Sequence, residues 1–161
     1  MKQIVCISMI LAALVLFAGC RKNLSNFTFI YSMESVNNYK LTLSFNSDKT
    51  YKMEEHNYFM DNHANRRAPV IREGVLTDGE YSEVVRHLSA CNFFKMKDSY
   101  GFEKEADRDL GDIMYQVTFI TDGKEKYISI RNSDDNRFPS SFINLLKHIN
   151  TFLREHNVKE E

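Results

Sequence analysis

Several motifs by which enzymes and cofactor-binding domains are recognised are missing from this sequence. Its 161 residues contain no glycine-rich phosphate loop, no Gly-x-Ser-x-Gly nucleophile elbow, no His-Glu-x-x-His motif and no closely spaced pair of cysteines. Glycine occurs 6 times and proline 2 times, and no Pro/Gly/Ser-rich linker divides the chain. We therefore expect one domain without enzymatic activity and without a cofactor. A small hydrolase or a metal-dependent enzyme is the alternative, because catalytic groups scattered along a sequence can converge in the fold.

Tryptophan is absent as well, and so is a concentrated basic segment. The 12 phenylalanines and 8 tyrosines supply enough aromatic surface for a core without tryptophan. Basic residues alternate with acidic ones, and the formal net charge is -1. Phosphate binding needs basic side chains gathered on one surface, so we expect no nucleic-acid partner.

What the N-terminus does contain is a short apolar run that ends at a cysteine. Lys2 precedes the run Ile4–Phe17, which is broken only by Ser8. About 14 residues are too few to cross a hydrocarbon core of about 30 Å comfortably as a helix. Cleavage after residue 19 is therefore expected, but Phe17 does not suit an ordinary signal peptidase, which prefers small residues at that position.

The letters LFAGC, residues 16–20, resemble the lipobox of bacterial lipoproteins, in which the cysteine thiol receives diacylglycerol before the signal is cut. The family prefers leucine where this chain has Phe17. The resemblance implies a signal peptide over residues 1–19, a lipidated Cys20 as the mature N-terminus and a short tether over residues 20–26. Two or three acyl chains anchor firmly, because each buried methylene contributes about 0.8 kcal/mol. An uncleaved membrane helix and a secreted form are the alternatives.

The residues after Cys20 indicate a location. Lipoproteins kept at an inner membrane often carry aspartate there, and those exported to the cell surface in some lineages carry an acidic run, whereas this chain has Arg21 and Lys22. By resemblance, this pair indicates a domain at the outer membrane that faces the periplasm. The tether Arg21–Asn26 spans at most about 20 Å. We therefore expect the domain to lie close to the bilayer and to meet an envelope protein or polymer there; the sequence does not predict an oligomeric state.

One domain is predicted over residues 27–157, followed by a polar tail at 158–161. Four segments have the composition or alternation of strands: FTFIYSM (27–33), YKLTLSF (39–45), KTYKME (49–54) and VIREGVL (70–76). Asn46–Asp48 predicts a tight turn between the second and third of these segments, and residues 55–69 predict a loop.

Two helices and a further hairpin follow in the sequence. Thr77 and Glu80 form a capping-box pattern ahead of a predicted helix over Asp78–Cys91. IMYQVTFI and KEKYISIR are joined by Asp-Gly, a strong hairpin signal. Pro139 suits the first position of a last helix, whose apolar stripe has a period of 3.6 residues. The predicted fold is α+β, an antiparallel sheet of hairpins with two amphipathic helices on one face, in the order strands, helix, hairpin, helix.

The succession YKLTLSFNSDKTY, GVLTDGEYSEV, NFFKMKDSY and VTFITDGKEKYISI, closed by the proline-led helix, resembles a family of small secreted or lipid-anchored bacterial proteins built around an uncharacterised domain. The resemblance covers residues 27 to about 155. The first hairpin lacks the turn glycine that such proteins often have. Because the family has no settled activity, the resemblance implies a fold and no mechanism.

Two clusters with possible metal chemistry are interpreted as structural. The loop after residue 102 holds five carboxylates: Glu103, Glu105, Asp107, Asp109 and Asp112. Its spacing does not match an EF-hand, because Thr118 stands where the bidentate glutamate belongs, so we predict a solvated loop and no metal. His87 and Cys91 lie four residues apart on one helix, but zinc needs three or four ligands. Cys91 is predicted to be a small buried hydrophobe and, with Cys6 removed, the one free thiol.

The loop EHNYFMDNHANRRAP, residues 55–69, is the best candidate for a contact surface. It combines apolar side chains with arginines: Tyr58, Phe59, Met60, Arg66 and Arg67. Such a tip suits a partner or lipid headgroups, with the arginines meeting anionic groups. The competing interpretation is that the apolar trio folds back onto the domain. An enzyme would instead use the acidic loop or His56, His63 and His87.

Overall fold

The computed structural model describes residues 24–35, 38–58, 68–102, 113–131 and 136–156. Within these residues the chain forms a mixed sheet of seven strands and two α-helices, which confirms the predicted α+β class. The strands are β1 (Phe27–Ser35), β2 (Tyr39–Asn46), β3 (Thr50–Asn57), β4 (Val70–Val75), β5 (Ser99–Tyr100), β6 (Ile113–Thr121) and β7 (Lys124–Arg131). The helices are α2 (Asp78–Ala90) and α3 (Ser140–His156), and a single 3-10 turn, η2 (Phe93–Lys95), follows α2.

Neighbouring strands run in the order β4-β3-β2-β1-β6-β7-β5, and every pair is antiparallel except β5 with β7. The predicted element order is wrong in one place, because η2 and β5 separate α2 from the last hairpin. The expectation of a wholly antiparallel sheet is wrong at the same strand. β5 is held by bonds distant in sequence, such as the Ser129 N–H that donates to the Asp98 carbonyl at 2.9 Å. Two strand residues are too few for an alternation that sequence analysis could detect.

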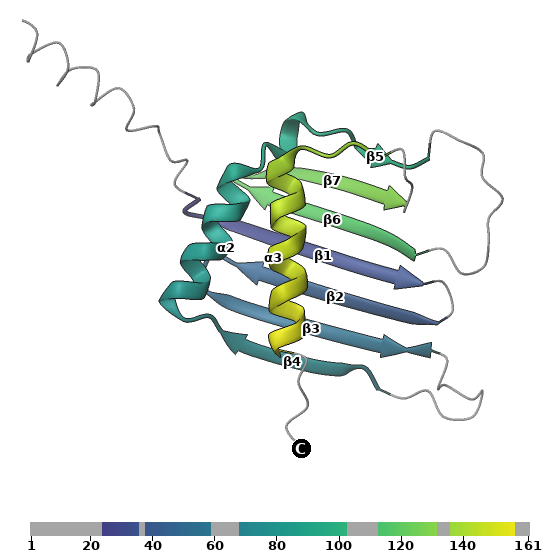
Figure 1. Cartoon of the computed structure of the whole chain (residues 1–161). Helices are drawn as coiled ribbons and strands as arrows, with labels where there is room; N and C mark the ends of the chain where they lie inside the picture. Colours follow the sequence, from purple (N-terminus) through teal and green to yellow (C-terminus); the bar gives the residue numbers. More distant parts are fainter. Residues whose placement is uncertain (1–23, 36–37, 59–67, 103–112, 132–135, 157–161) are drawn as a thin grey trace, which may run out of the picture.

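Both helices pack on one face of the sheet and cross its strands, so the molecule has two layers (Figure 1). Alternate strand residues point to that face, where the register sets Phe29 beside Phe45 and Tyr31 beside Leu43. The predicted stripe of α3 is buried against them at four positions: Phe142, Leu145, Ile149 and Phe152. The opposite face of the sheet, called the outer face below, carries the intervening and mostly polar side chains.

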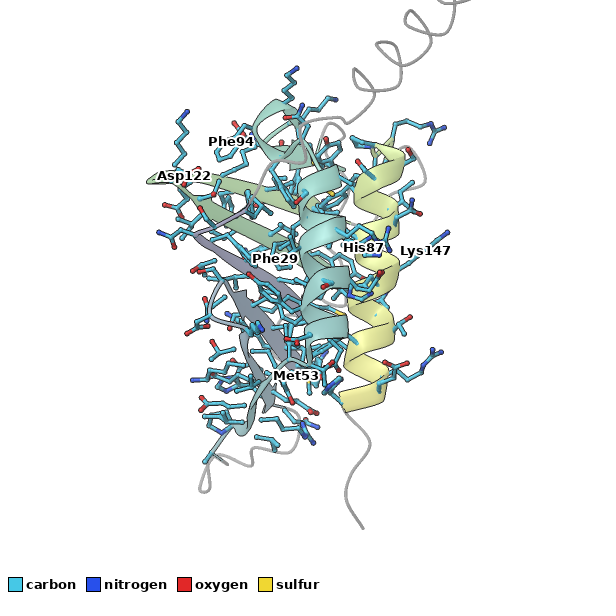
Figure 2. The ribbon with its side chains drawn as sticks, turned by 90° about the vertical axis from the view of Figure 1, so that its left-hand side faces the viewer. Phe29, Met53, His87, Phe94, Asp122 and Lys147 are labelled. Carbon is cyan, nitrogen blue, oxygen red and sulfur yellow. The ribbon has the colours of Figure 1, made fainter. Side chains whose placement is uncertain are left out.

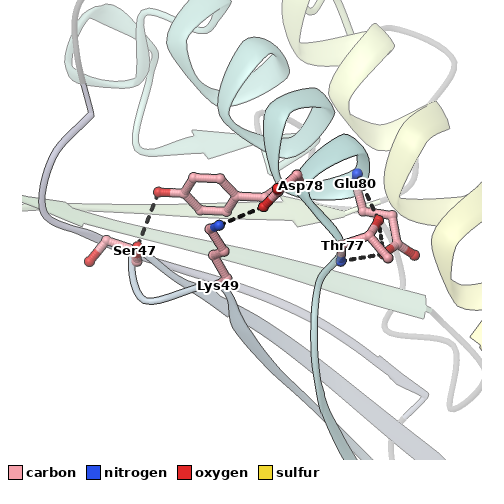
Figure 3. Close-up of polar contacts among 6 residues, drawn as sticks. Ser47, Lys49, Thr77, Asp78 and Glu80 are labelled. Atoms are coloured by element: carbon pink, nitrogen blue, oxygen red, sulfur yellow. Dashed lines mark hydrogen bonds and ion pairs between the residues drawn. The ribbon is translucent and has the colours of Figure 1, made fainter.

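The start of α2 is fixed by the predicted capping box. Thr77 Oγ1 accepts a hydrogen bond from the Glu80 N–H at 3.3 Å, and the Glu80 carboxylate accepts one from the Thr77 N–H at 2.7 Å (Figure 3). Lys49 Nζ donates to Asp78 at 2.6 Å and ties this end of α2 to the β2–β3 turn. The helix ends one residue before the predicted Cys91, whose N–H caps it.

β3 continues through Asn57, so the predicted loop begins too early. Glu55 lies opposite Leu41 of β2 and forms an ion pair with Arg72 of β4 at 3.6 Å. Cross-strand pairing with β2 and β4 thus prolongs the strand where the apolar alternation is lost. The greater part of that loop, residues 59–67, lies outside the described residues.

The last helix begins after Pro139. The Pro139 carbonyl accepts the N–H groups of Phe142 and Ile143 at 3.0 and 3.1 Å. Pro139 therefore occupies the cap position rather than the predicted first helical position. Either place suits proline, because neither requires its missing N–H.

Candidate functional site

The described chain starts at one end of the sheet, called the proximal end below. Leu24 packs against the core there, and the Asn26 carbonyl accepts a hydrogen bond from Thr121 Oγ1 at 3.0 Å. The β2–β3 and β6–β7 turns lie at the same end, because β1 begins where β2 and β6 end. Cys20, the predicted lipidation site, lies outside the described residues. The four steps from Cys20 to Leu24 span at most about 14 Å when extended.

A small hollow of about 170 Å³ opens at the proximal end. Its apolar lining comes from Leu24, Leu88, Cys91, Phe93, Phe94 and Phe119. Phe94 is 41% exposed, whereas its neighbour Phe93 is 1% exposed. Figure 2 looks onto the proximal end and shows Phe94 and Asp122 at one corner of this end. Asp122 also lines the hollow. A phenylalanine thus remains accessible beside the first described residue.

Cys91 is a buried, free thiol, as predicted, and is 8% exposed. Burial raises the pKa of this thiol to about 11, although a hydrogen bond with Ser141 opposes the rise. The thiolate that a nucleophile or metal ligand requires is therefore scarce at neutral pH. His87, proposed as its possible partner, stacks instead on His148.

The predicted contact loop leaves the sheet at the opposite end, called the distal end below. Of its five candidate residues only Tyr58 is described, while Phe59, Met60, Arg66 and Arg67 lie outside the described residues. Tyr58 is 37% exposed and its ring stacks on that of His56 with centroids 5.7 Å apart. Its N–H donates to the Asn38 carbonyl at 2.8 Å. Tyr58 is therefore held on the surface and does not fold into the core.

The two ends are separated by the length of a strand. β3 begins at Thr50 at the proximal end and reaches Asn57 at the distal end. Eight residues of antiparallel strand extend about 27 Å. Phe102 and Ile113 are also exposed at the distal end, where they flank the acidic loop, whose carboxylates lie outside the described residues. The distal end therefore gathers exposed apolar side chains far from Leu24.

Of the histidines proposed for an enzyme, the two that the structure describes, His56 and His87, do not converge. His56 lies on the outer face with its Nε2 2.7 Å from Glu54, and His156 lies at the end of α3 with its Nε2 3.5 Å from Glu80. His63 lies outside the described residues. In the part of the chain that the structure describes, no three His, Cys, Asp or Glu side chains form a group that could hold a metal.

The structure shows a pair of stacked histidines between the two helices, which the sequence analysis did not predict. His87 of α2 and His148 of α3 stack with ring centroids 4.7 Å apart. Arg86 Nη2 lies 2.8 Å from His87 Nε2 and also binds the Glu83 carboxylate. Burial lowers the pKa of both imidazoles, and the Arg86 charge lowers them further. The sequence shows one histidine beside the apolar stripe of each helix. No sequence pattern indicates that these two histidines contact each other.

No helix within the described residues is long and apolar enough to span a bilayer. Neither a protein-family model nor a curated protein matches the sequence.

Proposed function

We propose that the chain is a lipid-anchored protein of the bacterial cell envelope whose α+β domain is a non-enzymatic binding module. The observation that carries the proposal is LFAGC at residues 16–20, where a cysteine follows an apolar run and two small residues. A thiol at the boundary between the apolar run and the polar chain suits the attachment of diacylglycerol. Two or three acyl chains hold a protein firmly in a membrane. Arg21 and Lys22 favour the outer membrane, with the domain facing the periplasm.

The same proposal places the domain in the family that its hairpins and helix caps resemble. The motifs concerned, such as YKLTLSFNSDKTY and GVLTDGEYSEV, form a hairpin and a capped helix in this chain. These motifs indicate a fold and no activity. The proposed function therefore depends on the location of the protein and on the surface of its domain. Location is therefore the first property to test.

The arrangement of the two ends supports a binding role directed away from the anchor. The segment from Cys20 to Leu24 spans at most about 14 Å, so a lipid on Cys20 would hold Leu24 close to the bilayer. The loop between β3 and β4 then leaves the sheet about 27 Å further out. Of the two partners considered for this loop, an envelope protein or polymer is favoured over the headgroups of the membrane to which the chain is anchored.

The intact mass of the mature protein extracted from membranes tests the anchor. A chain that begins at Cys20 and carries added acyl mass is expected, and Cys20→Ala should abolish both the processing and the added mass. An unmodified chain that retains residues 1–19 would contradict the anchor and would indicate an uncleaved membrane helix instead.

Crosslinking in intact envelopes tests the binding role. We expect specific partners to be recovered with the wild-type chain and lost with the double variant Arg66→Ala, Arg67→Ala. Ile143 and Lys147 are exposed on α3. The double variant Ile143→Ser, Lys147→Ala is therefore the control, and it should still recover the partners. If all three proteins recover the same partners, the loop is not the contact surface. If the wild-type chain recovers no specific partner, the result counts against a binding module.

A further inference from the structure

We propose that one corner of the proximal end, formed by Phe94, Lys95 and Lys124, lies against the anionic surface of the membrane that holds the chain. The inference rests on the proposed lipid anchor and adds the orientation of the anchored domain. The Phe94 ring would enter the interfacial layer and the two lysines would face lipid phosphates. We call these three residues the Phe94 corner.

The position of the corner follows from where the described chain starts. Leu24 and Phe94 line the same hollow, together with Phe119 and Thr121. Because Cys20 is at most about 14 Å from Leu24, a lipid on that residue brings the rim of this hollow within reach of the bilayer surface. No rearrangement of the domain is needed for the contact.

The exposure of Phe94 is the second observation. η2 is one 3-10 turn, in which Phe93 is buried among core rings and Phe94 projects outward. The Phe94 ring lies tilted beside that of Phe119, with the two centroids 6.2 Å apart. An exposed aromatic ring that borders an apolar hollow suits the boundary between headgroups and acyl chains.

The charges around Phe94 complement an anionic surface. Lys95 follows it in the chain and is exposed. Lys124 lies opposite Thr121 in the β6–β7 register, on the same face as Phe119, because alternate residues share a face. Asp122 is the one acidic residue that lines the hollow. Basic side chains at a membrane surface are attracted by anionic lipids, and Arg21 and Lys22 of the tether add to this attraction.

Other exposed apolar residues are badly placed for the same contact. Tyr58, Phe102 and Ile113 lie at the distal end, about a strand length from Leu24. Ile143 is exposed on α3, which crosses the middle of the sheet (Figure 1). Val75 is 71% exposed at the proximal end, but β2 and β3 lie between its strand and β1, which begins just after Leu24. The Phe94 corner is therefore the exposed apolar feature that borders Leu24 itself.

The absence of tryptophan makes a direct test possible, because one substitution adds the only tryptophan of the chain. Phe94→Trp and the control Ile143→Trp replace side chains of similar exposure, 41% and 39%. Each lipidated protein is placed in vesicles of phosphatidylcholine and phosphatidylglycerol that contain lipids brominated near the headgroup. We expect blue-shifted, strongly quenched emission from position 94 and unshifted, weakly quenched emission from position 143.

A second probe and a charge variant complete the test. Asn92→Trp, on the rim of the same hollow, should also be quenched, and it replaces the first probe if Phe94→Trp fails to fold by circular dichroism. Lys95→Glu with Lys124→Glu should reduce the quenching at position 94 several-fold. Equal quenching at positions 94 and 143, or none at either, would overturn the inference.

The mass of each protein separates this inference from the proposed function. If the chain carries no lipid at Cys20, the proposed function fails and the inference fails with it. If the chain is lipidated and position 94 is quenched no more than position 143, the anchor stands and only the orientation is wrong.

Discussion

At Gly74 the lack of a side chain lets a tyrosine ring cross the edge of the sheet. A Cβ at this position would lie 2.7 Å from the Tyr51 ring, which is closer than any carbon contact allows. The other side of that ring meets Phe152 and His156, with centroids 5.2 and 5.3 Å away. Because the ring is held on both sides, it cannot easily move to admit a methyl group.

Gly74→Ala is therefore expected to lower the free energy of unfolding by about 1–3 kcal/mol, the usual cost of overpacking a well-packed contact. Urea denaturation followed by circular dichroism measures the change. Gly79→Ala is the matched control, since the nearest atom to its Cβ is Thr77 Oγ1 at 4.0 Å. In the first turn of α2 this control should raise stability by up to about 1 kcal/mol. Equal effects of the two variants would contradict the packing argument.

The stacked pair His87 and His148 makes stability depend on pH. Both imidazoles have a lowered pKa in the folded chain, chiefly because burial disfavours the charged form. The unfolded chain therefore binds more protons once the pH falls below the ordinary histidine pKa of about 6.5. Stability is fully present above that pH and declines below it. The carboxylates Glu80 and Glu83, whose pKa values are lowered, weaken the fold only at more acidic pH, below about 4.5.

We expect the free energy of unfolding to fall as the pH drops below about 6.5, and His148→Phe to reduce this fall. Phenylalanine keeps a ring against His87 but carries no proton, and it removes the buried Nε2 that has no hydrogen-bond partner. Urea unfolding at several pH values measures the difference between the two proteins. Asn150→Ala, at an exposed position of the same helix as His148, carries no titratable group and is the control that should follow the wild type. A decline of wild-type size in His148→Phe would exclude the stacked pair as its cause.

At the scale of single elements, the start of α2 combines a capping box with an ion pair to the β2–β3 turn. Thr77→Ala removes the oxygen that accepts the Glu80 N–H and is expected to destabilise the domain by about 1 kcal/mol. Thermal and urea denaturation report the loss. Ser82→Ala, at an exposed position of the same helix, should change stability little. If Thr77→Ala behaved like Ser82→Ala, the cap would contribute nothing measurable.

The elements that could be predicted from the sequence are those set by local interactions. The capping box at Thr77, the Asp122–Gly123 turn and the stripe of α3 each lie within one segment, so their patterns are complete in the sequence. Asp122 and Gly123 both have positive φ, 50° and 72°, as a hairpin turn of this kind requires.

The features that could not be predicted depend on contacts between distant segments. β5 pairs with β7 through two residues, and Glu55 near the end of β3 forms an ion pair with Arg72, 17 positions later in the chain. The His87–His148 stack joins two helices whose relative rotation no single-segment pattern determines. The hollow at the proximal end combines residues from three separate parts of the chain: Leu24, residues 88–94 and residues 119–122. Sequence patterns describe each segment by itself and leave such combinations undetermined.

At the scale of the whole molecule, the sheet separates the proximal end, which we propose to lie at the membrane, from the distal end, which we propose to contact a partner. The chain enters beside the Phe94 corner, and the loop between β3 and β4 leaves about 27 Å away. Because the helices cross the strands and cover one face, the sheet has the second layer that it needs to stay ordered over this length (Figure 1). If the chain is anchored as proposed, a short tether and this rigid sheet would hold the loop at a fixed distance from the bilayer.

Tether length then becomes a testable property of the whole protein. Insertion of about 10 Gly/Ser residues after Asn23 lowers the effective concentration of the Phe94 corner at the bilayer, since a flexible linker of this length spans roughly 16–19 Å on average. We expect the acyl mass at Cys20 and the membrane fractionation to be unchanged, and the quenching of Phe94→Trp by brominated lipids to fall. Addition of the same residues after Glu161 is the control for added length alone. Unchanged quenching with the longer tether would mean that the corner holds the bilayer by its own affinity, and that tether length does not set the orientation of the domain.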